Sequence, residues 1–267
     1  MNKKNYDYKF EDIIKSLLAC NIKSGDNVYI SGNLFNFGLC KTNSFNKIPE
    51  LFYKAVTEII TKQGTIIVPT HTFYLANSNK IFDLKKTKSI SGSFSNFILK
   101  KNKAIRQIHP FSSSTAIGKN ANYFCSKNTS HVYGPNSPFD RMIKKKTKFL
   151  SLGLPINLNC SQVHHAEFMM KVPYRYNKKF QQKIKIKNNV YKKEFYMFVL
   201  KEKFMNIKRN KNKLILDNFK KFEKIDKSKL GNDFIYSYNL KNFYKQNKIL
   251  LKKNIFCWVG KKLKIGY

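Results

Sequence analysis

Apolar positions in the first two-thirds of the chain alternate between the period of a helix and that of a strand. Residues 10–20 place apolar side chains every three or four positions, as an amphipathic helix does, and a Ser-Gly-Asp turn then leads into a short strand at 27–31. The same succession returns as a helix at 47–62 and a strand at 65–69. We therefore expect an α/β fold with a mainly parallel central sheet flanked by helices.

The pattern continues through the middle of the chain. A short helix begins at Gly92, and Ser137 followed by proline opens another. The compact apolar segment 147–152 predicts a further strand, after which Ser161 is placed to cap a helix. We expect residues 1–172 to form an α/β core that carries the functional sites.

The last third of the chain has a different pattern. Alternation with period two at 183–187 and in much of 191–200 predicts strands, and 232–238 and 249–259 have strand-like composition. We expect 173–267 to form a β-rich C-terminal lobe that packs on the same domain. Because this part contains no histidine, we do not expect catalysis there.

Composition indicates a folded protein without a membrane span. Hydrophobic residues make up 42% of the chain, and no apolar run approaches the ~18 residues that a span requires. Charges at Glu11, Asp12 and Lys15 make the N-terminal stretch an amphipathic helix rather than a signal peptide. The five cysteines are scattered, with no CxxC pair, which favours reduced thiols in the cytoplasm over disulfides or a zinc site.

The formal net charge of +37 has two interpretations. Only four of the 52 basic residues are arginine, and Lys, Asn, Ile, Phe and Tyr are all abundant, which is the residue choice of an AT-rich genome. Nucleic-acid surfaces more often use arginine, so we expect no obligatory nucleic-acid partner. The alternative is a non-enzymatic basic module that binds RNA or another anionic polymer through its lysine-rich tail. In either case the charge favours an anionic ligand.

The residues with the clearest chemistry are Ser161, His164 and Glu167. They are three residues apart, so on a helix they would share one face within side-chain reach of each other. A carboxylate beside an imidazole orients the ring and raises its basicity, and the ring can then take up a proton. The spacing therefore predicts a proton-transfer site.

Short sequence blocks between residues 24 and 175 stand in an order and spacing that chance rarely produces. They are Ser24-Gly25-Asp26, Val68-Pro69-Thr70-His71-Thr72-Phe73, Phe82-Asp83 with Thr87 and Gly92, Arg106-Gln107-Ile108-His109-Pro110 with Ser113 and Gly118, Gly134-Pro135-Asn136-Ser137-Pro138-Phe139, Leu152-Gly153, and Ser161 to Glu167. Through these blocks the chain resembles the aminoglycoside 3-N-acetyltransferase family of acyl-CoA-dependent transferases. The tail resembles that family only in outline.

The resemblance implies an enzyme that moves an acetyl group from acetyl-CoA directly to an amino group of an amino sugar. The family's catalytic pattern falls on Ser161, His164 and Glu167, with Ser in place of the usual Thr. It implies that His164 is the general base and that Glu167 orients it. Ser161 would hydrogen-bond the tetrahedral oxyanion or the departing thiolate. Neither a covalent enzyme intermediate nor a metal is expected.

One loop departs from the family pattern. Where the family has His-Ser-Ser-Leu after the first strand, in a loop that contacts the acyl-CoA, this chain has Ser31-Gly32-Asn33-Leu34. Backbone and amide groups of Gly32 and Asn33 would then bind the donor. The departure indicates a divergent branch with a different acceptor, with a catalytically silent homologue as a further possibility.

Other candidates lie in the remaining blocks. Arg106, with Ser113, is assigned to the donor site as a contact for a CoA phosphate, the alternative being a structural ion pair with Asp83 or Asp140. His71, Thr72 and Asp83 are assigned to the acceptor pocket, because ligands collect at strand ends in sheets of this kind.

Other roles are considered for the histidines. His109 is expected to shape a turn and His131 to be a loop residue. A metal site built from His71, His109 and His164 lacks the spacing of known zinc motifs.

The acceptor is open between two kinds of amino sugar. An aminoglycoside carries several ammonium groups and needs an acidic cleft, but the chain has only 15 acidic residues. An anionic sugar, such as a nucleotide-linked precursor of a surface glycan, suits the charge better. The sequence does not predict an oligomeric state.

Overall fold

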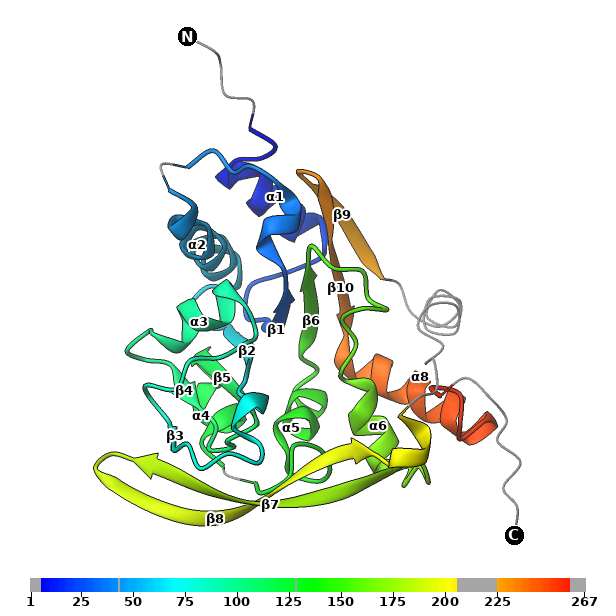
Figure 1. Cartoon of the computed structure of the whole chain (residues 1–267). Coiled ribbons are helices and arrows are strands. Elements are labelled where there is room, and N and C mark those ends of the chain that lie inside the picture. Colours follow the sequence, from blue (N-terminus) through cyan, green and yellow to red (C-terminus); the bar gives the residue numbers. More distant parts are fainter. Residues whose placement is uncertain (1–5, 43, 128, 206–224, 260–267) are drawn as a thin grey trace.

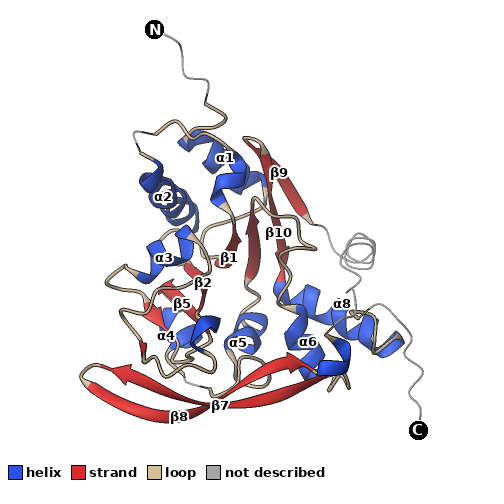
Figure 2. Cartoon of the chain, in the orientation of Figure 1, coloured by secondary structure: helices blue, strands red, loops and turns tan. Residues whose placement is uncertain are grey.

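The computed structural model describes residues 6–42, 44–127, 129–205 and 225–259 (Figure 1). Two parts of the predicted C-terminal lobe, 206–224 and 260–267, lie outside these residues. Helices and strands alternate through the first two-thirds of the chain, as the pattern of apolar positions predicts (Figure 2).

The described elements fall into two sheets and a set of helices. The central sheet contains β1 (Asn27–Gly32), β2 (Thr65–His71), β4 (Ile105–Arg106), β5 (Ser112–Gly118), β6 (Lys148–Leu152), β9 (Asp226–Leu230) and β10 (Asp233–Asn239). The second sheet contains β3 (Phe82–Asp83), β7 (Arg175–Ile186) and β8 (Asn189–Leu200). The α-helices are α1 (Phe10–Ala19), α2 (Ile48–Ile60), α3 (Ser93–Leu99), α4 (Ala121–Cys125), α5 (Pro138–Lys144), α6 (Val163–Met169) and α8 (Leu240–Lys253). The 3-10 helices are η1 (Leu34–Phe37), η2 (Phe45–Lys47), η3 (Phe73–Leu75) and η4 (Glu202–Phe204).

Only the centre of the seven-stranded sheet is parallel. In the order β4-β5-β2-β1-β6-β10-β9, strand β1 runs parallel to β2 and β6, and the four outer pairings are antiparallel. The α/β class with flanking helices is confirmed, but the expectation of a mainly parallel sheet is corrected. One reason is that β9 and β10 are joined by the two-residue turn 231–232, which only an antiparallel pair permits.

Helices cover both faces of this sheet, and alternate strand residues point to opposite faces. Val28 and Ile30 of β1 pack in one apolar cluster with α1, α2 and α3. Tyr29, between them, packs in a second cluster with α4, α5, α6 and α8. The helix that carries His164 therefore rests on the second of these cores.

Strands β7 and β8 form a long antiparallel hairpin that crosses the lower edge of the molecule in Figure 1. Its strands confirm the predictions for 183–187 and 191–200. Toward the tip, Ile184 and Phe195 pack in a small third cluster with Phe82 and Phe111. Nearer the base, the ring of Phe198 contacts that of Phe168 on α6 at 5.2 Å. The hairpin therefore packs against the helix that carries His164.

The end of the described chain corrects another prediction. Strand β10 confirms the strand expected at 232–238, but the strand expected at 249–259 is wrong, because α8 extends to Lys253 and turns follow it. The buried face of α8 consists of Leu240, Phe243, Asn247 and Leu251, a helical spacing. No helix in the described part of the chain is long and apolar enough to cross a membrane.

Candidate active site

The segment from Ser161 to Glu167 lies in a turn and helix that follow β6. Helix α6 begins at Val163, and the backbone N–H of His164 donates to the carbonyl of Ser161 at 3.1 Å. Gln162 precedes the helix without a side-chain cap, so the prediction that Ser161 caps it is wrong. His164 and Glu167 do share one face of α6, and Ser161 is exposed at the start of that helix.

Glu167 is the centre of a buried polar cluster. Its side chain is 1% exposed, and its Oε2 atom lies 2.6 Å from Nδ1 of His164 and 2.8 Å from Nε of Arg175. The buried Tyr174 donates its hydroxyl to Oε1 at 2.9 Å. Both carboxylate oxygens are therefore engaged. The side chain of His164 remains 22% exposed.

The charges in this cluster favour an ionised carboxylate. Burial raises the pKa of Glu167, but His164, Arg175 and the Tyr174 hydroxyl outweigh it, so that pKa lies below its usual range. Burial also raises the pKa of Tyr174, which therefore remains a hydrogen-bond donor. A carboxylate facing Nδ1 favours the tautomer with its proton on Nδ1. The second ring nitrogen, Nε2, is then the basic one, and the arrangement can accept a proton.

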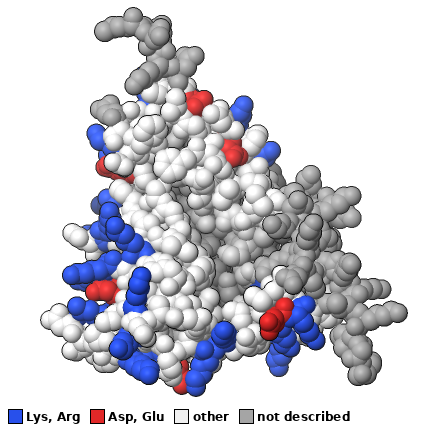
Figure 3. All heavy atoms as spheres, viewed as in Figure 1, with Lys and Arg blue, Asp and Glu red and all other residues white. Residues whose placement is uncertain are grey.

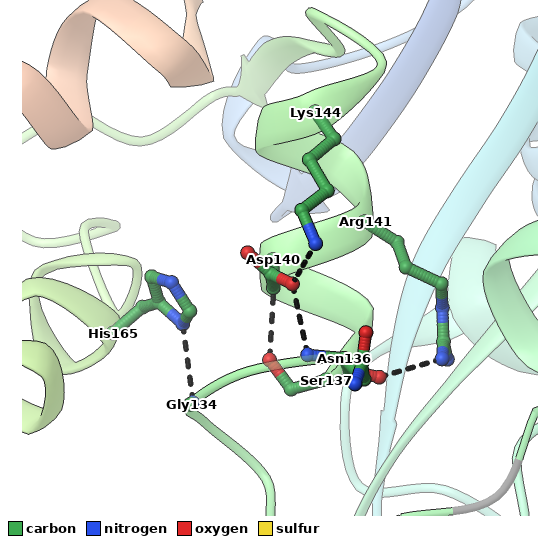
Figure 4. Close-up of polar contacts among 7 residues, drawn as sticks. All are labelled: Gly134, Asn136, Ser137, Asp140, Arg141, Lys144 and His165. Atoms are coloured by element: carbon green, nitrogen blue, oxygen red, sulfur yellow. Dashed lines mark hydrogen bonds and ion pairs between the residues drawn. The ribbon is translucent and has the colours of Figure 1, made fainter.

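The loop from Gly134 to Ser137, which leads into α5, is tied to α6 by His165. The Nδ1 atom of His165 accepts the backbone N–H of Gly134 at 3.4 Å, and the ring points toward this loop (Figure 4). Burial lowers the pKa of His165 to about 4, so its ring is neutral. Ser137 caps α5 by accepting from the backbone N–H of Asp140 (3.3 Å), and Asp140 accepts from that of Asn136 (2.8 Å). This histidine therefore packs and positions the loop.

The predicted donor-binding residues lie where β1 and β6 end side by side. Gly32 pairs with Leu152, and a Cβ atom at Gly32 would overlap the carbonyl oxygen of Leu152. The backbone N–H of Asn33 donates to the same oxygen at 2.8 Å. Asn159, in the segment before α6, donates to the carbonyl of Ser31 at 3.1 Å. The loop is thus linked directly to the segment that leads into α6.

Arg106 and Ser113, also assigned to the donor site, lie inside the protein. Arg106 is 6% exposed, and its Nε donates to Oγ of Ser113 at 3.0 Å. Its terminal nitrogens donate to the carbonyls of Thr87 (2.7 Å) and Thr70 (3.0 Å). Burial lowers the pKa of Arg106 to about 10. These contacts give both residues a structural role in the β2–β5 pair.

The three residues predicted for the acceptor pocket have different surroundings. His71 ends β2 and stacks on Phe73 at 4.8 Å, and burial lowers its pKa to about 4. Thr72 is fully buried and donates to a backbone carbonyl at 2.7 Å. The carboxylates of Asp83 and Asp140 accept backbone N–H groups of their own turns instead of pairing with a buried arginine. Of the three residues predicted for the acceptor pocket, His71 is the one that lies on a central strand, at its carboxyl end.

The remaining histidines take part in packing. His109 is fully buried, and its Nδ1 accepts the backbone N–H of Ser112 at 3.1 Å, consistent with the predicted turn role. His131 stacks on a tyrosine of β8 at 4.5 Å. Among the residues that the structure describes, no three His, Cys, Asp or Glu side chains are grouped to hold a metal ion, so His71, His109 and His164 do not form a metal site.

Helical spacing does not point to Tyr174 and Arg175. They follow α6 and lie at the start of β7, so they reach Glu167 only through the fold. Composition contains one signal, because Arg175 is one of only four arginines in a chain whose positive charge is nearly all lysine. A guanidinium is the cation best suited to a buried carboxylate.

The chain is similar to known proteins in both sequence and fold. A family model described as aminoglycoside 3-N-acetyltransferase matches residues 36–250. The chain belongs to the aminoglycoside 3-N-acetyltransferase family. Membership confirms the resemblance of the sequence blocks and the expectation of an acetyl-CoA-dependent N-acetyltransferase. No curated protein matches the chain.

Solved structures of similar fold include several aminoglycoside acetyltransferases. The structure of AAC(3)-IIb matches with a TM-score of 0.78 and 16% identity, covering 95% of this chain and 99% of that one. AAC-IIIb in a binary complex with CoASH matches with a TM-score of 0.76 and 16% identity (96% and 100% covered). Sisomicin-bound AAC-VIa matches with a TM-score of 0.77 and 16% identity (92% and 98% covered). This member of the aminoglycoside 3-N-acetyltransferase family therefore shares their fold over nearly its whole length.

Proposed function

We propose that this protein acetylates an amino group of an amino sugar, using acetyl-CoA and His164 as the general base. The observation that carries the proposal is the 2.6 Å contact between His164 and Glu167. Glu167 is almost fully buried, and its pKa lies below the usual range, so its charge is available to hold the ring and stabilise the imidazolium. The side chain of His164 is 22% exposed, so it is the part of the pair that a substrate can reach.

The proposed transfer is direct. The acceptor nitrogen attacks the thioester carbonyl carbon and forms the C–N bond, while Nε2 of His164 takes a proton from that nitrogen. Collapse of the tetrahedral intermediate breaks the C–S bond, and the CoA sulfur leaves with the proton that His164 returns. Ser161, exposed at the start of α6, is proposed to donate its hydroxyl to the oxyanion or to the departing sulfur.

The donor is proposed to approach through the loop at Ser31–Asn33. Support comes from its position at the carboxyl ends of β1 and β6 and from the Asn159 contact that joins it to the segment before α6. A cavity of about 420 Å³ adjoins the loop at Leu34, and Lys100 is among its lining residues. AAC-IIIb, which has the same fold, has been solved with CoASH.

The acceptor is proposed to be an anionic amino sugar, such as one linked to a nucleotide. Both carboxylates on α5 and α6 are offset by cations: Glu167 by Arg175, and Asp140 by Lys144 at 2.8 Å. Lysines project from the β7–β8 hairpin, which packs on α6, and Figure 3 shows Lys and Arg along that lower edge with few acidic side chains. This surface favours an anion over the polycationic aminoglycosides.

Free-thiol release from acetyl-CoA tests the proposal across two acceptor panels, aminoglycosides and nucleotide-linked amino sugars. We expect turnover on the second panel and a loss of about 10²–10⁴-fold in His164→Ala, because the general base is removed. His131→Ala is the matched control, since His131 is also partly exposed but packs on β8.

The outcomes separate the parts of the proposal. Turnover of aminoglycosides alone would refute the anionic acceptor and leave the chemistry intact. A folded, fully active His164→Ala protein would refute the mechanism. Silence on both panels, with no binding of CoA, would refute the proposed reaction and favour a binding module or a silent homologue.

A further inference from the structure

Arg175 places a positive charge beside the pair that handles the proton. Its Nε atom lies 2.8 Å from the same oxygen, Oε2 of Glu167, that contacts Nδ1 of His164. The Arg175 side chain is 6% exposed, so water screens its charge little. Two positive or potentially positive groups thus share one carboxylate oxygen in a buried site.

The contact acts mainly through charge. The N–H of Nε is not aligned for a hydrogen bond to any described partner, although the atom lies within ion-pair distance of Glu167. The guanidinium is held instead by the hairpin, where Nη1 donates to the carbonyl of Phe198 at 3.4 Å and the group lies 5.7 Å from the centre of that ring. The hairpin therefore fixes the position of the charge next to α6.

We propose that Arg175 is a positioning residue that keeps Glu167 ionised while opposing a second positive charge on His164. This inference rests on the proposed role of His164 as the base. A carboxylate alone would stabilise the imidazolium and could leave the ring protonated, and so unable to act, near neutral pH. Sharing the carboxylate with Arg175 weakens that stabilisation, so His164 stays unprotonated but still oriented.

The other ionisable groups that the structure describes next to this pair are neutral. Tyr133, from the loop before α5, lies edge-on to the ring of His164 at 5.9 Å, and burial raises its pKa, so it stays neutral. Tyr174, from the segment before β7, is neutral as well. Cys257, after α8, has its pKa raised to about 12 by burial and by Glu167. Among the residues that the structure describes, Arg175 is therefore the cation in contact with Glu167.

The test is the titration of His164 followed by NMR in the full-length protein, with its ring resonances assigned from their loss in His164→Gln. In Arg175→Gln, the midpoint should rise by about one to two pH units, because the positive charge that shares Oε2 of Glu167 with the ring has been removed. Arg175→Lys should keep the His164 midpoint close to the wild-type value, because lysine retains the positive charge and the effect does not depend on a directed hydrogen bond. Lys179→Gln, also on β7 but exposed and paired with Glu194, is the matched control and should leave the midpoint unchanged.

A second variant covers the case in which Arg175→Gln does not fold. Glu167→Gln leaves Arg175 beside His164 without the carboxylate, and the midpoint should then fall below the ordinary histidine value of about 6.5. An unchanged midpoint in either variant would overturn the role of Arg175. So would a rise in Arg175→Lys as large as that in Arg175→Gln.

Kinetics separate this inference from the proposed function. The acid limb of kcat/KM should move to higher pH in Arg175→Gln by the same amount as the NMR midpoint, whereas a merely structural role would lower activity without moving it. If wild-type protein acetylates neither acceptor panel, the proposed function fails, but the NMR test still stands. If wild type is active and the limb does not move, only the role of Arg175 fails.

Discussion

Replacing Glu167 by glutamine changes one atom in the buried cluster and should affect both stability and turnover. The carboxylate accepts from Tyr174 and faces His164 and Arg175 within 2.6–2.9 Å. A glutamine can still accept from Tyr174 through its carbonyl. Its NH₂ group would then face two groups that carry hydrogens, and the buried Arg175 would lose its counter-charge.

The magnitudes follow from burial. Removing one partner of a buried ion pair costs about 3–5 kcal/mol. In a chain of this size each kcal/mol lowers Tm by roughly 2–4 °C, so we expect Tm to fall by roughly 6–20 °C. His164 would also have to accept a hydrogen bond at Nδ1, which places its proton on Nε2, the wrong tautomer for a base. Turnover should therefore fall by about 10²–10⁴-fold.

Thermal unfolding and release of the CoA thiol measure the two effects. An enzyme-only blank is needed in the thiol assay because Cys160 is partly exposed, whereas the other four cysteines are buried. Glu194→Gln is the matched control, since Glu194 is exposed on β8 and paired with Lys179, and it should change neither quantity measurably. A Glu167→Gln protein with wild-type Tm and turnover would refute the roles of the Glu167 charge in stability and in catalysis.

The same residue predicts a pH dependence of stability. The folded-state pKa of Glu167 lies below its usual range, so its contribution is complete above the ordinary glutamate value of about 4.3 and is lost as pH falls through the folded-state pKa. Wild-type protein should therefore lose stability more steeply below about pH 4 than Glu167→Gln. Parallel acid-unfolding curves for the two proteins would contradict the depressed pKa.

Two substitutions test the surrounding structure. Gly32→Ala should lower the free energy of unfolding by about 1–3 kcal/mol and weaken CoA binding, because the added Cβ would push against the Leu152 carbonyl and separate β1 from β6. Calorimetry with CoA measures the binding. Unchanged binding would argue against a donor site at this loop. Arg106→Met should lower the free energy of unfolding by about 1–3 kcal/mol, because the carbonyls of Thr87 and Thr70 would lose their donor, and it should not raise KM for acetyl-CoA. A large rise in KM at unchanged Tm would instead indicate that Arg106 binds the donor.

Elements with a strong local period are predictable here, and elements without one are not. Helices α1 and α2 and strands β1, β2 and β6 follow from the spacing of their apolar residues. Strand β5 carries a run of Ser and Thr whose buried hydroxyls bond across to β2, so its sequence lacks an apolar signal. The short apolar run inside α8 is ambiguous between helix and strand, and its buried positions 240, 243, 247 and 251 become evident only over the whole helix.

The pairing of His164 with Glu167 follows from their spacing alone, because residues three apart on a helix are neighbours whatever surrounds them. The sequence also predicts the alternation of elements and, through blocks in register, the family. The groups that act on the His164–Glu167 pair depend instead on how distant elements pack. Tyr174 and Arg175 reach Glu167 because β7 begins beside α6, and Arg106 is withdrawn from solvent because β2 and β5 close around it. Burial and charge contacts between separate elements depend on how those elements pack, which no local spacing specifies.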